Sequence, residues 1–274
     1  MKEIWIHQEL YIDSLLVEHH LTACNAVATP LDPSFPLGCE DATYPSIDNL
    51  MHAYQHLIGS LLFLQLCSQP DISFVVLLLS QFCSAPLPHH YAVAQCVLCY
   101  LKGTKSSHLH FGGVRKEEVL SEMTDADWAG DRSGWVSISG FVWSYSGGPI
   151  SWSMKKQNCM VLSSTEVEYV MLTQALQEGI WLHNSLHQIG VPVPSPLLIA
   201  TDNNGALSLA LNDSSHGCAK HIDIRYHFIC SHIEGGDFKI IHTLGIVNTA
   251  DIFTKLLGHV KFQEHVAQLG LGTH

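Results

Sequence analysis

Charged side chains are scarce in this 274-residue sequence, and basic ones are the scarcest. Asp, Glu, Lys and Arg make up 14% of the residues, with 13 Lys and Arg against 25 Asp and Glu, and the formal net charge is -12. So acidic a chain lacks the strongly basic surface that neutralises many phosphates of a nucleic acid. The 47% apolar content also excludes a disordered chain, which needs low hydrophobicity and high charge.

Long apolar runs are missing as well. The two longest apolar stretches, Leu57–Leu66 and Ile72–Leu79, fall short of the roughly 20 residues that cross a bilayer, so they predict buried helices. The first residues contain no basic segment followed by an apolar one, which argues against a secretory signal. Nine irregularly spaced cysteines favour a reducing intracellular setting, with cytoplasm and nucleus both open.

The first part of the chain has helical periodicity. Four prolines between residues 29 and 48 predict a long loop, and a glycine-rich, charged stretch at 103–117 predicts a hinge. We therefore expect two domains, a helical one at 1–110 and a second one at 119–270. The helices of the first are predicted at 8–22, 49–67, 70–84 and 88–102.

The second part changes to strand patterns. Three strands joined by a turn at Gly147-Gly148-Pro149 predict an antiparallel meander, and a helix is predicted to start near Ser163. A strand at Leu197–Thr201 then begins an alternation of helices and strands, which predicts an α/β fold with a mixed sheet flanked by helices. The remaining predicted segments are strands at 119–126, 138–146, 157–162 and 238–242, and helices at 203–211, 219–234 and after Asn248.

Four acidic residues are placed where such a fold would bring them together. Asp125 and Asp202 end predicted strands, Glu168 lies one turn into a helix, and Asp251 starts the last helical stretch. Clustered carboxylates require cations to stay ionised, and hard oxygen ligands suit Mg²⁺ or Mn²⁺. The alternative is that these acids are ordinary turn or cap residues.

Several motifs resemble the ribonuclease H region of copia-type retrotransposon Pol polyproteins, in the order in which that family has them. The motifs are Thr124–Asp131, Gly148–Ser153, Lys155–Gln157, Leu162–Tyr169, Thr201–Asn203, Lys220–Phe228 and Ala250–Lys255. Upstream, Tyr54–Leu62, Gln69–Ile72 and Tyr100–Thr104 resemble the C-terminal, thumb-like end of the family's reverse transcriptase. The resemblance implies a ribonuclease H-like domain preceded by a mainly helical reverse-transcriptase remnant.

The resemblance also implies a reaction. The family's catalytic carboxylates fall on Asp125, Glu168, Asp202 and Asp251, which would hold two Mg²⁺ ions, or Mn²⁺, and cut RNA endonucleolytically in an RNA/DNA hybrid. Glu168 fits the motif better than Glu166, and Asp127 is a weaker competitor for Asp125. His242 is an additional candidate as a proton carrier.

Other features point away from full activity. The sequence has no Tyr/Phe-x-Asp-Asp polymerase motif, so the polymerase domain of such a polyprotein would lie upstream. Residues of several other types replace the arginines that the family usually carries, and only three arginines remain. These departures support an alternative in which the chain is a decayed or domesticated relic that keeps the fold for weak nucleic-acid or protein binding. The positions are Gln69, Cys96, Cys99, Trp135, His183, Cys218 and Cys230, with Leu244 and Leu256 for proline and Gly134 for aspartate.

Several smaller groups of metal-binding residue types remain. His183 and His187 lie four residues apart, and we interpret them as part of a solvated helix face. Cys96 and Cys99 have zinc-type spacing, but no second pair matches them, so we interpret them as a fortuitous pair. His19 and His20 are interpreted as surface residues at a helix end.

Overall fold

The computed structural model describes residues 3–33, 35, 49–112, 120–131, 136–156, 164–203, 207 and 220–272. Within these ranges it does not describe the side chains of 126–131, 136, 164–169, 220–224 and 226. The chain forms two compact units. We call Phe111–Lys255 the sheet unit, and Ile4–His110 together with Leu256–His274 the helical unit.

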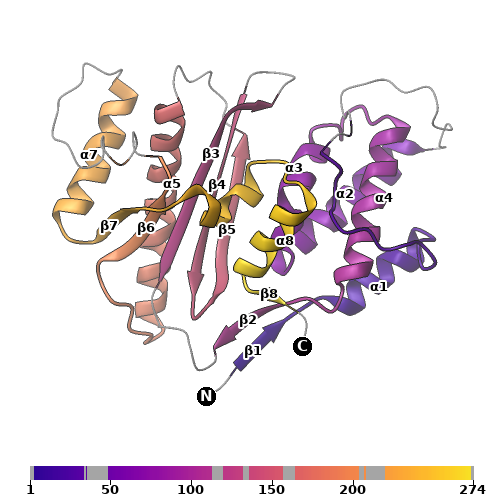
Figure 1. Cartoon of the computed structure of the whole chain (residues 1–274), viewed down its shortest axis with the longest axis horizontal. Coiled ribbons are helices and arrows are strands. Elements are labelled where there is room, and N and C mark those ends of the chain that lie inside the picture. Colours follow the sequence, from indigo (N-terminus) through magenta and orange to yellow (C-terminus); the bar gives the residue numbers. More distant parts are fainter. Residues whose placement is uncertain are drawn as a thin grey trace. The chain divides into compact units, whose positions relative to one another are not determined.

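The sheet unit contains a five-stranded mixed sheet with the strand order β5-β4-β3-β6-β7 (Figure 1). Strands β3, β4 and β5 form an antiparallel meander, whereas β6 and β7 run parallel to β3. This arrangement confirms the predicted α/β class with a ribonuclease H-like mixed sheet. The strand bounds are β3 Ser121–Asp131, β4 Val136–Tyr145, β5 Gly148–Lys156, β6 Leu197–Thr201 and β7 Phe238–His242.

The turn between β4 and β5 is formed by Ser146 and Gly147, not by the predicted Gly147-Gly148-Pro149. Ser146 and Gly147 both have positive φ angles, 50° and 82°, which is the geometry of a two-residue type I′ hairpin turn. Gly148 and Pro149 therefore belong to β5 instead of the turn. The third strand of the meander is β5, which ends at Lys156, before the strand predicted at 157–162. The structure does not describe residues 157–162.

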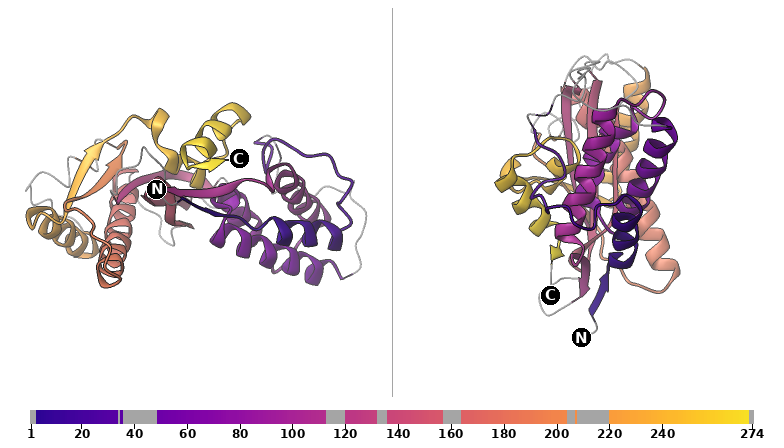
Figure 2. Two further views of the ribbon diagram at one scale, coloured as in Figure 1. Left: turned by 90° about the horizontal axis from the view of Figure 1, so that it is seen from below. Right: turned by 90° about the vertical axis from the view of Figure 1, so that its right-hand side faces the viewer.

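Helices cover one face of the sheet. Helix α5 (Ser164–Gln188) packs along β3 and β4, α7 (Lys220–Glu234) packs beside it, and a short helix, η3 (Thr249–Phe253), lies on the other face (Figure 2). The core between α5 and the sheet is built around Trp143, which is fully buried and donates from Nε1 to the carbonyl of Ala175 at 3.1 Å. The predicted helix at 203–211 lies outside the described residues except for 203 and 207.

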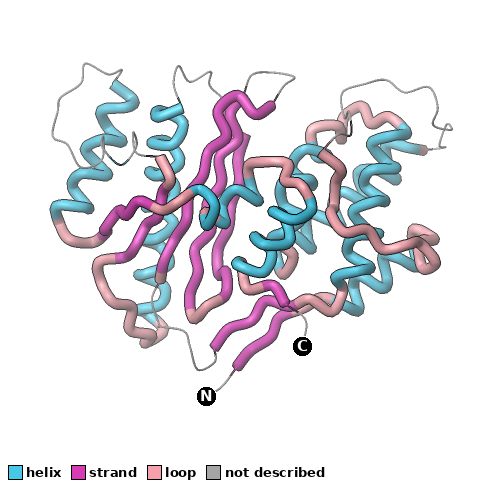
Figure 3. Tube along the Cα trace, viewed as in Figure 1, coloured by secondary structure: helices cyan, strands magenta, loops and turns pink. Residues whose placement is uncertain are grey.

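The helical unit is a packed set of α-helices (Figure 3). Helix α8 belongs here, because Phe262 makes an edge contact with Tyr100 and Gln263 donates to the carbonyl of Ala28 at 2.8 Å. A small sheet of order β1-β2-β8 adds three strands that the sequence patterns did not indicate. The bounds are β1 Glu3–Ile6, α1 Glu9–Glu18, α2 Leu50–Cys67, η1 Pro70–Ile72, α3 Ser73–Ser80, α4 Pro88–Thr104, β2 His108–Gly112, α8 His259–Gln268 and β8 Leu271–Gly272.

Apolar residues at helical spacing hold this unit together. Ile12 of α1, Leu61 of α2 and Val97 of α4 are completely buried, as the predicted helical periodicity requires. None of the helices in the described part of the chain has the length and apolar character needed to span a bilayer.

Candidate active site

Three of the four predicted carboxylates meet in the sheet unit. Asp125, Asp202 and Asp251 each offer an oxygen, and the three oxygens all lie within 4.8 Å of one another. Asp125 and Asp251 are each only 2% exposed, whereas Asp202 is partly exposed. We call this cluster the carboxylate site.

The parallel pairing of β3 and β6 positions two of these residues. Thr124 of β3 is opposite Thr201 of β6. Asp125 and Asp202 directly follow these two threonines in the chain, so they lie at the same level of the sheet. Asp125 also faces Gly140 of β4, on the side of the sheet away from α5. The convergence therefore results from strand direction, because adjacent parallel strands present their carboxyl ends at one edge.

Asn248 brings the third acid to the same place. Its side-chain nitrogen donates to the carbonyl of Thr124 at 2.8 Å, and its side-chain oxygen accepts from the backbone of Ala250 at 3.2 Å, which caps η3. Thr249 adds a contact to the sulfur of Met123 at 3.2 Å. Since Asn248 is completely buried, these bonds fix η3, and with it Asp251, against the strand that carries Asp125.

A lysine lies between the two buried acids. Lys255 Nζ is 2.7 Å from Asp251 Oδ1 and 3.0 Å from Asp125 Oδ2. Thr254 donates its hydroxyl to the same carboxylate of Asp125. Burial raises the pKa of Asp125, and Lys255 and Thr254 oppose that shift. Burial disfavours the charged form of Lys255, but Asp125 and Asp251 outweigh it, so the pKa of Lys255 is raised.

The donor set fits a hard divalent cation. All three groups are carboxylates, the ligand type that Mg²⁺ and Mn²⁺ prefer, and their oxygens are near enough to share an ion. The ammonium group of Lys255 contacts two of the three acids, which shows that this place in the fold already requires a compensating positive charge.

The remaining predicted residues are described less fully. Glu168 lies near the start of α5, but its side chain, like that of Glu166, is outside the described part of the structure. The same holds for the side chain of Asp127. His242 is the last residue of β7, opposite Thr201, and is exposed.

Two glycines at the site were not predicted from the sequence. A Cβ atom at Gly140 would lie 2.6 Å from the Cβ of Phe253, so only a glycine lets η3 approach the sheet this closely. A Cβ atom at Gly245 would lie 3.0 Å from Asp202 Oδ2. Both contacts join segments distant in the sequence, and no local pattern indicates them.

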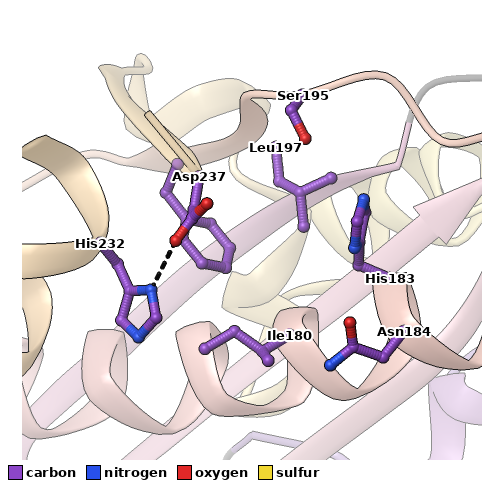
Figure 4. Close-up of a pocket in the computed structure, with 8 residues that line it drawn as sticks. Ile180, His183, Asn184, Ser195, Leu197, His232 and Asp237 are labelled. Carbon is purple, nitrogen blue, oxygen red and sulfur yellow. Dashed lines mark hydrogen bonds and ion pairs between the residues drawn. The ribbon is translucent and has the colours of Figure 1, made fainter. Parts of the chain in front are cut away.

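The sheet unit also has a cavity of about 200 Å³, at the end of β6 opposite Asp202. Figure 4 shows His183 and Asn184 of α5 on one side, and on the other His232, whose Nδ1 is 2.7 Å from Asp237 Oδ2. The full lining is Ile180, His183, Asn184, Ser195, Leu197, His232, Asp237 and Phe238. It contains no residue of the carboxylate site.

Comparison with known proteins places the chain in a family. It is 33% identical over 265 residues to the retrovirus-related Pol polyprotein from transposon TNT 1-94 of Nicotiana tabacum, and 34% identical over 268 residues to that from transposon RE1 of Arabidopsis thaliana. The chain belongs to the retrovirus-related Pol polyproteins of transposons. These matches cover 96% and 97% of the chain, so they confirm the predicted family resemblance across both units.

The chain spans about a fifth of the length of these relatives, 20% and 18% respectively. Among solved structures, it is similar in fold to a ribonuclease H1 isolated from compost, with a TM-score of 0.39 and 15% identity over 50% of this chain and 94% of that one. None of the protein-family models matches the chain.

Proposed function

We propose that this chain hydrolyses RNA within RNA/DNA hybrids by endonucleolytic cleavage, as the ribonuclease H part of a retrotransposon polyprotein. The carboxylate site carries the proposal, because Asp125, Asp202 and Asp251 present oxygens within 4.8 Å of one another. We assign Glu168, at the start of α5, as the fourth ligand on the strength of its sequence motif. The proposed cofactor is a pair of Mg²⁺ ions, or Mn²⁺ in their place.

Two bound Mg²⁺ ions would supply an activated water and stabilise the leaving oxygen of the cleaved phosphodiester. The chain's own residues provide the positioning. Asn248 holds η3 against β3, so the carboxylates of Asp125 and Asp251 keep one relative arrangement. Thr254 donates to Asp125 and thereby orients that carboxylate. Such positioning matters because small displacements of catalytic groups cost large factors in rate.

The other assignments rest on the family. We propose that residues 1–110 are the C-terminal remnant of a reverse transcriptase and that residues 119–270 are the ribonuclease H-like domain, whose last part, from Leu256, lies in the helical unit. We also propose that an upstream polymerase domain completes the polyprotein. The proposed nucleic-acid partner is an RNA/DNA hybrid. The low number of arginines predicts that the chain binds the hybrid weakly and with a small salt dependence, because few phosphates are contacted.

A second candidate function is a folded relic without nuclease activity. One observation favours it: Glu122 of β3 is buried on the α5 side of the sheet, and neither carboxyl oxygen has a hydrogen-bond partner among the described residues. A buried carboxyl without a partner destabilises a core. A chain that is no longer selected for activity would tolerate such a residue on the strand that carries Asp125.

Cleavage of a labelled RNA/DNA hybrid by the purified chain in Mg²⁺ separates the two. If the chain is a nuclease, we expect it to cleave the hybrid and Asp202→Asn to abolish the cleavage. Asp237→Asn changes an acid at the other end of the sheet and should leave the cleavage intact. Circular dichroism establishes that all three proteins are folded. Absence of cleavage by folded wild-type protein, in both Mg²⁺ and Mn²⁺, overturns the nuclease proposal and favours the relic.

A further inference from the structure

A second group of metal-ligating side chains lies in the helical unit. Glu18, His19 and His56 each offer one ligand atom, and these atoms all lie within 4.8 Å of one another. Glu18 ends α1, His19 caps it, and His56 lies on α2. The side chains of His56 and Glu18 are 60% and 51% exposed, so the group is open to solvent. The proposed nuclease chemistry uses none of these residues.

The end of α1 holds the first two residues in place. His20 has a positive φ of 57°, the backbone of Leu21 donates to Leu16 at 2.8 Å, and the backbone of His20 donates to Val17 at 3.1 Å. This pair of bonds is the Schellman motif, which ends a helix in one defined conformation. Glu18 and His19 are therefore presented by a fixed backbone, and the C-terminal end of a helix favours cations.

The two ring nitrogens of His19 differ in their hydrogen bonding. Its Nδ1 lies 3.2 Å from the hydroxyl of Tyr91 on α4, whereas its buried Nε2 has no hydrogen-bond partner in the described part of the chain. When Nδ1 carries the proton and donates to Tyr91, the lone pair on Nε2 is left for a metal. Metal-bound histidines commonly use this arrangement, because the second bond fixes the ring and its tautomer.

The contacts present within the group are weak. His56 Nδ1 and Glu18 Oε1 are 3.5 Å apart and largely exposed, and exposed ion pairs contribute little to stability. A cation that replaces the contact between His56 and Glu18 therefore costs the protein little stability. Two imidazoles and one carboxylate are a ligand set that zinc uses with a water in the fourth position, and imidazole is a poor ligand for Mg²⁺. We propose that Glu18, His19 and His56 form a Zn²⁺ site, independent of the carboxylate site.

The cysteines of the same unit are the competing zinc ligands. Cys96 and Cys99 lie on α4 near Cys24, and burial raises the pKa of both thiols, that of Cys99 to about 12. Zinc binds the thiolate, so these protonated thiols bind it poorly at neutral pH. They also do not form a group of three donors within mutual reach among the described residues.

The test is a Zn²⁺ titration of the purified chain against a chromophoric chelator, in excess Mg²⁺. The expected result is one tight zinc equivalent that His56→Gln and Glu18→Gln each weaken by about ten-fold or more. Tyr91→Phe, which removes only the bond to Nδ1, is expected to weaken it by about ten-fold to a hundred-fold. The matched control is His52→Gln, an exposed histidine one turn earlier on α2, which should not change the affinity.

Two further variants assign the zinc to its ligands. Cys99→Ser and Asp202→Asn should both leave the zinc affinity unchanged, and Co²⁺ in place of zinc should show no thiolate charge-transfer absorption. Loss of binding in Cys99→Ser with retention in His56→Gln assigns the ion to the thiols and overturns the proposal. No tight equivalent in the wild-type chain overturns it as well. Neither result bears on the nuclease proposal, which Asp202→Asn tests separately.

Discussion

Lys255 Nζ lies 2.7 Å from Oδ1 of Asp251, four residues earlier in the chain. The same nitrogen is 3.0 Å from an oxygen of Asp125, so one ammonium group balances two almost completely buried carboxylates. This contact has two consequences. It stabilises the fold in the absence of metal, and it occupies oxygens that a divalent ion would need.

Replacing the lysine by a neutral residue should separate these effects. In Lys255→Gln, we expect the metal-free protein to lose about 1–3 kcal/mol, because two buried acids lose their partner while the lysine itself is partly exposed. The Mg²⁺ concentration that gives half of the maximal thermal stabilisation should fall by about ten-fold, equivalent to about 1.4 kcal/mol. The measurement is a thermal melt over a Mg²⁺ series.

Lys239→Gln is the control for that melt, because Lys239 is an exposed lysine on β7 and should change neither quantity. An unchanged Mg²⁺ dependence in Lys255→Gln would contradict competition between the ammonium group and the ion.

Gly140 tests the approach of η3 to the sheet. In Gly140→Ala the new methyl group would lie 2.6 Å from the Cβ of Phe253 and 3.2 Å from Cγ2 of Thr254, so η3 must move. We expect a loss of about 1–3 kcal/mol, as in overpacked cores, together with reduced cleavage, because η3 carries Asp251. Urea unfolding and the hybrid assay measure the two effects. Gly59→Ala, where a Cβ atom meets nothing within 4 Å, should lower neither, and a fully active Gly140→Ala would refute the coupling.

Part of this site could be predicted from the sequence. The bounds of β7 agree with the predicted strand at 238–242, and the convergence of Asp125 and Asp202 follows from strand ends in a mixed sheet. The roles of Asn248, Gly140 and Lys255 could not be predicted, because each depends on a partner more than 100 residues away. Such contacts exist only after the tertiary fold has formed.

Strand prediction failed where the strands are short or lack alternation. Strand β8 has only two residues, too few for an alternating pattern, and all four residues of β1 are exposed, so that strand has no buried face that a sequence pattern can reveal. The burial of Glu122, in contrast, is indicated by the strand pattern. This residue shares a strand face with Leu120 and Thr124, and both of these are buried, so the period of two places a carboxyl in the core.

Tyr100 and Asp71 form a buried pair in the helical unit, with the tyrosine hydroxyl 2.5 Å from Asp71 Oδ2. Burial raises the pKa of Asp71 to about 6, although the bond from Tyr100 opposes the shift. The raised pKa means that this residue's contribution to stability is full below the ordinary pKa near 4 and is lost as the pH rises through 6.

Tyr100→Phe removes the bond that stabilises the ionised carboxylate of Asp71, so the variant should lose more free energy of unfolding at pH 8 than at pH 5. The expected loss at pH 8 is about 1–3 kcal/mol. Hydrogen exchange of the amides in α3 and α4 at both pH values is the measurement. Tyr54→Phe provides the matched control, because the hydroxyl of Tyr54 is bonded to the backbone carbonyl of Leu79 at 2.7 Å, and its loss should not depend on pH in this range. Equal costs at pH 5 and pH 8 for Tyr100→Phe would show that Asp71 does not titrate there.

Glu122 provides the corresponding prediction for the sheet unit. Complete burial raises the pKa of its carboxyl well above the ordinary value, and the described residues offer no hydrogen bond that would oppose the shift. The folded state therefore binds a proton that the unfolded state releases above about pH 4.3. The stability of the sheet unit should fall as the pH rises from that value toward the raised pKa.

Two variants separate the charge of Glu122 from its polarity. Glu122→Gln, which is neutral at every pH, should remove this part of the pH dependence. Glu122→Leu should additionally stabilise the sheet unit by about 1–3 kcal/mol at pH 8, because its neighbours in register are Trp143 and Ile199. Urea unfolding followed by tryptophan fluorescence, to which the buried Trp143 contributes, measures both. A Glu122→Gln protein that keeps the wild-type pH dependence would mean that another group causes it, since the variant has no proton to exchange at this position.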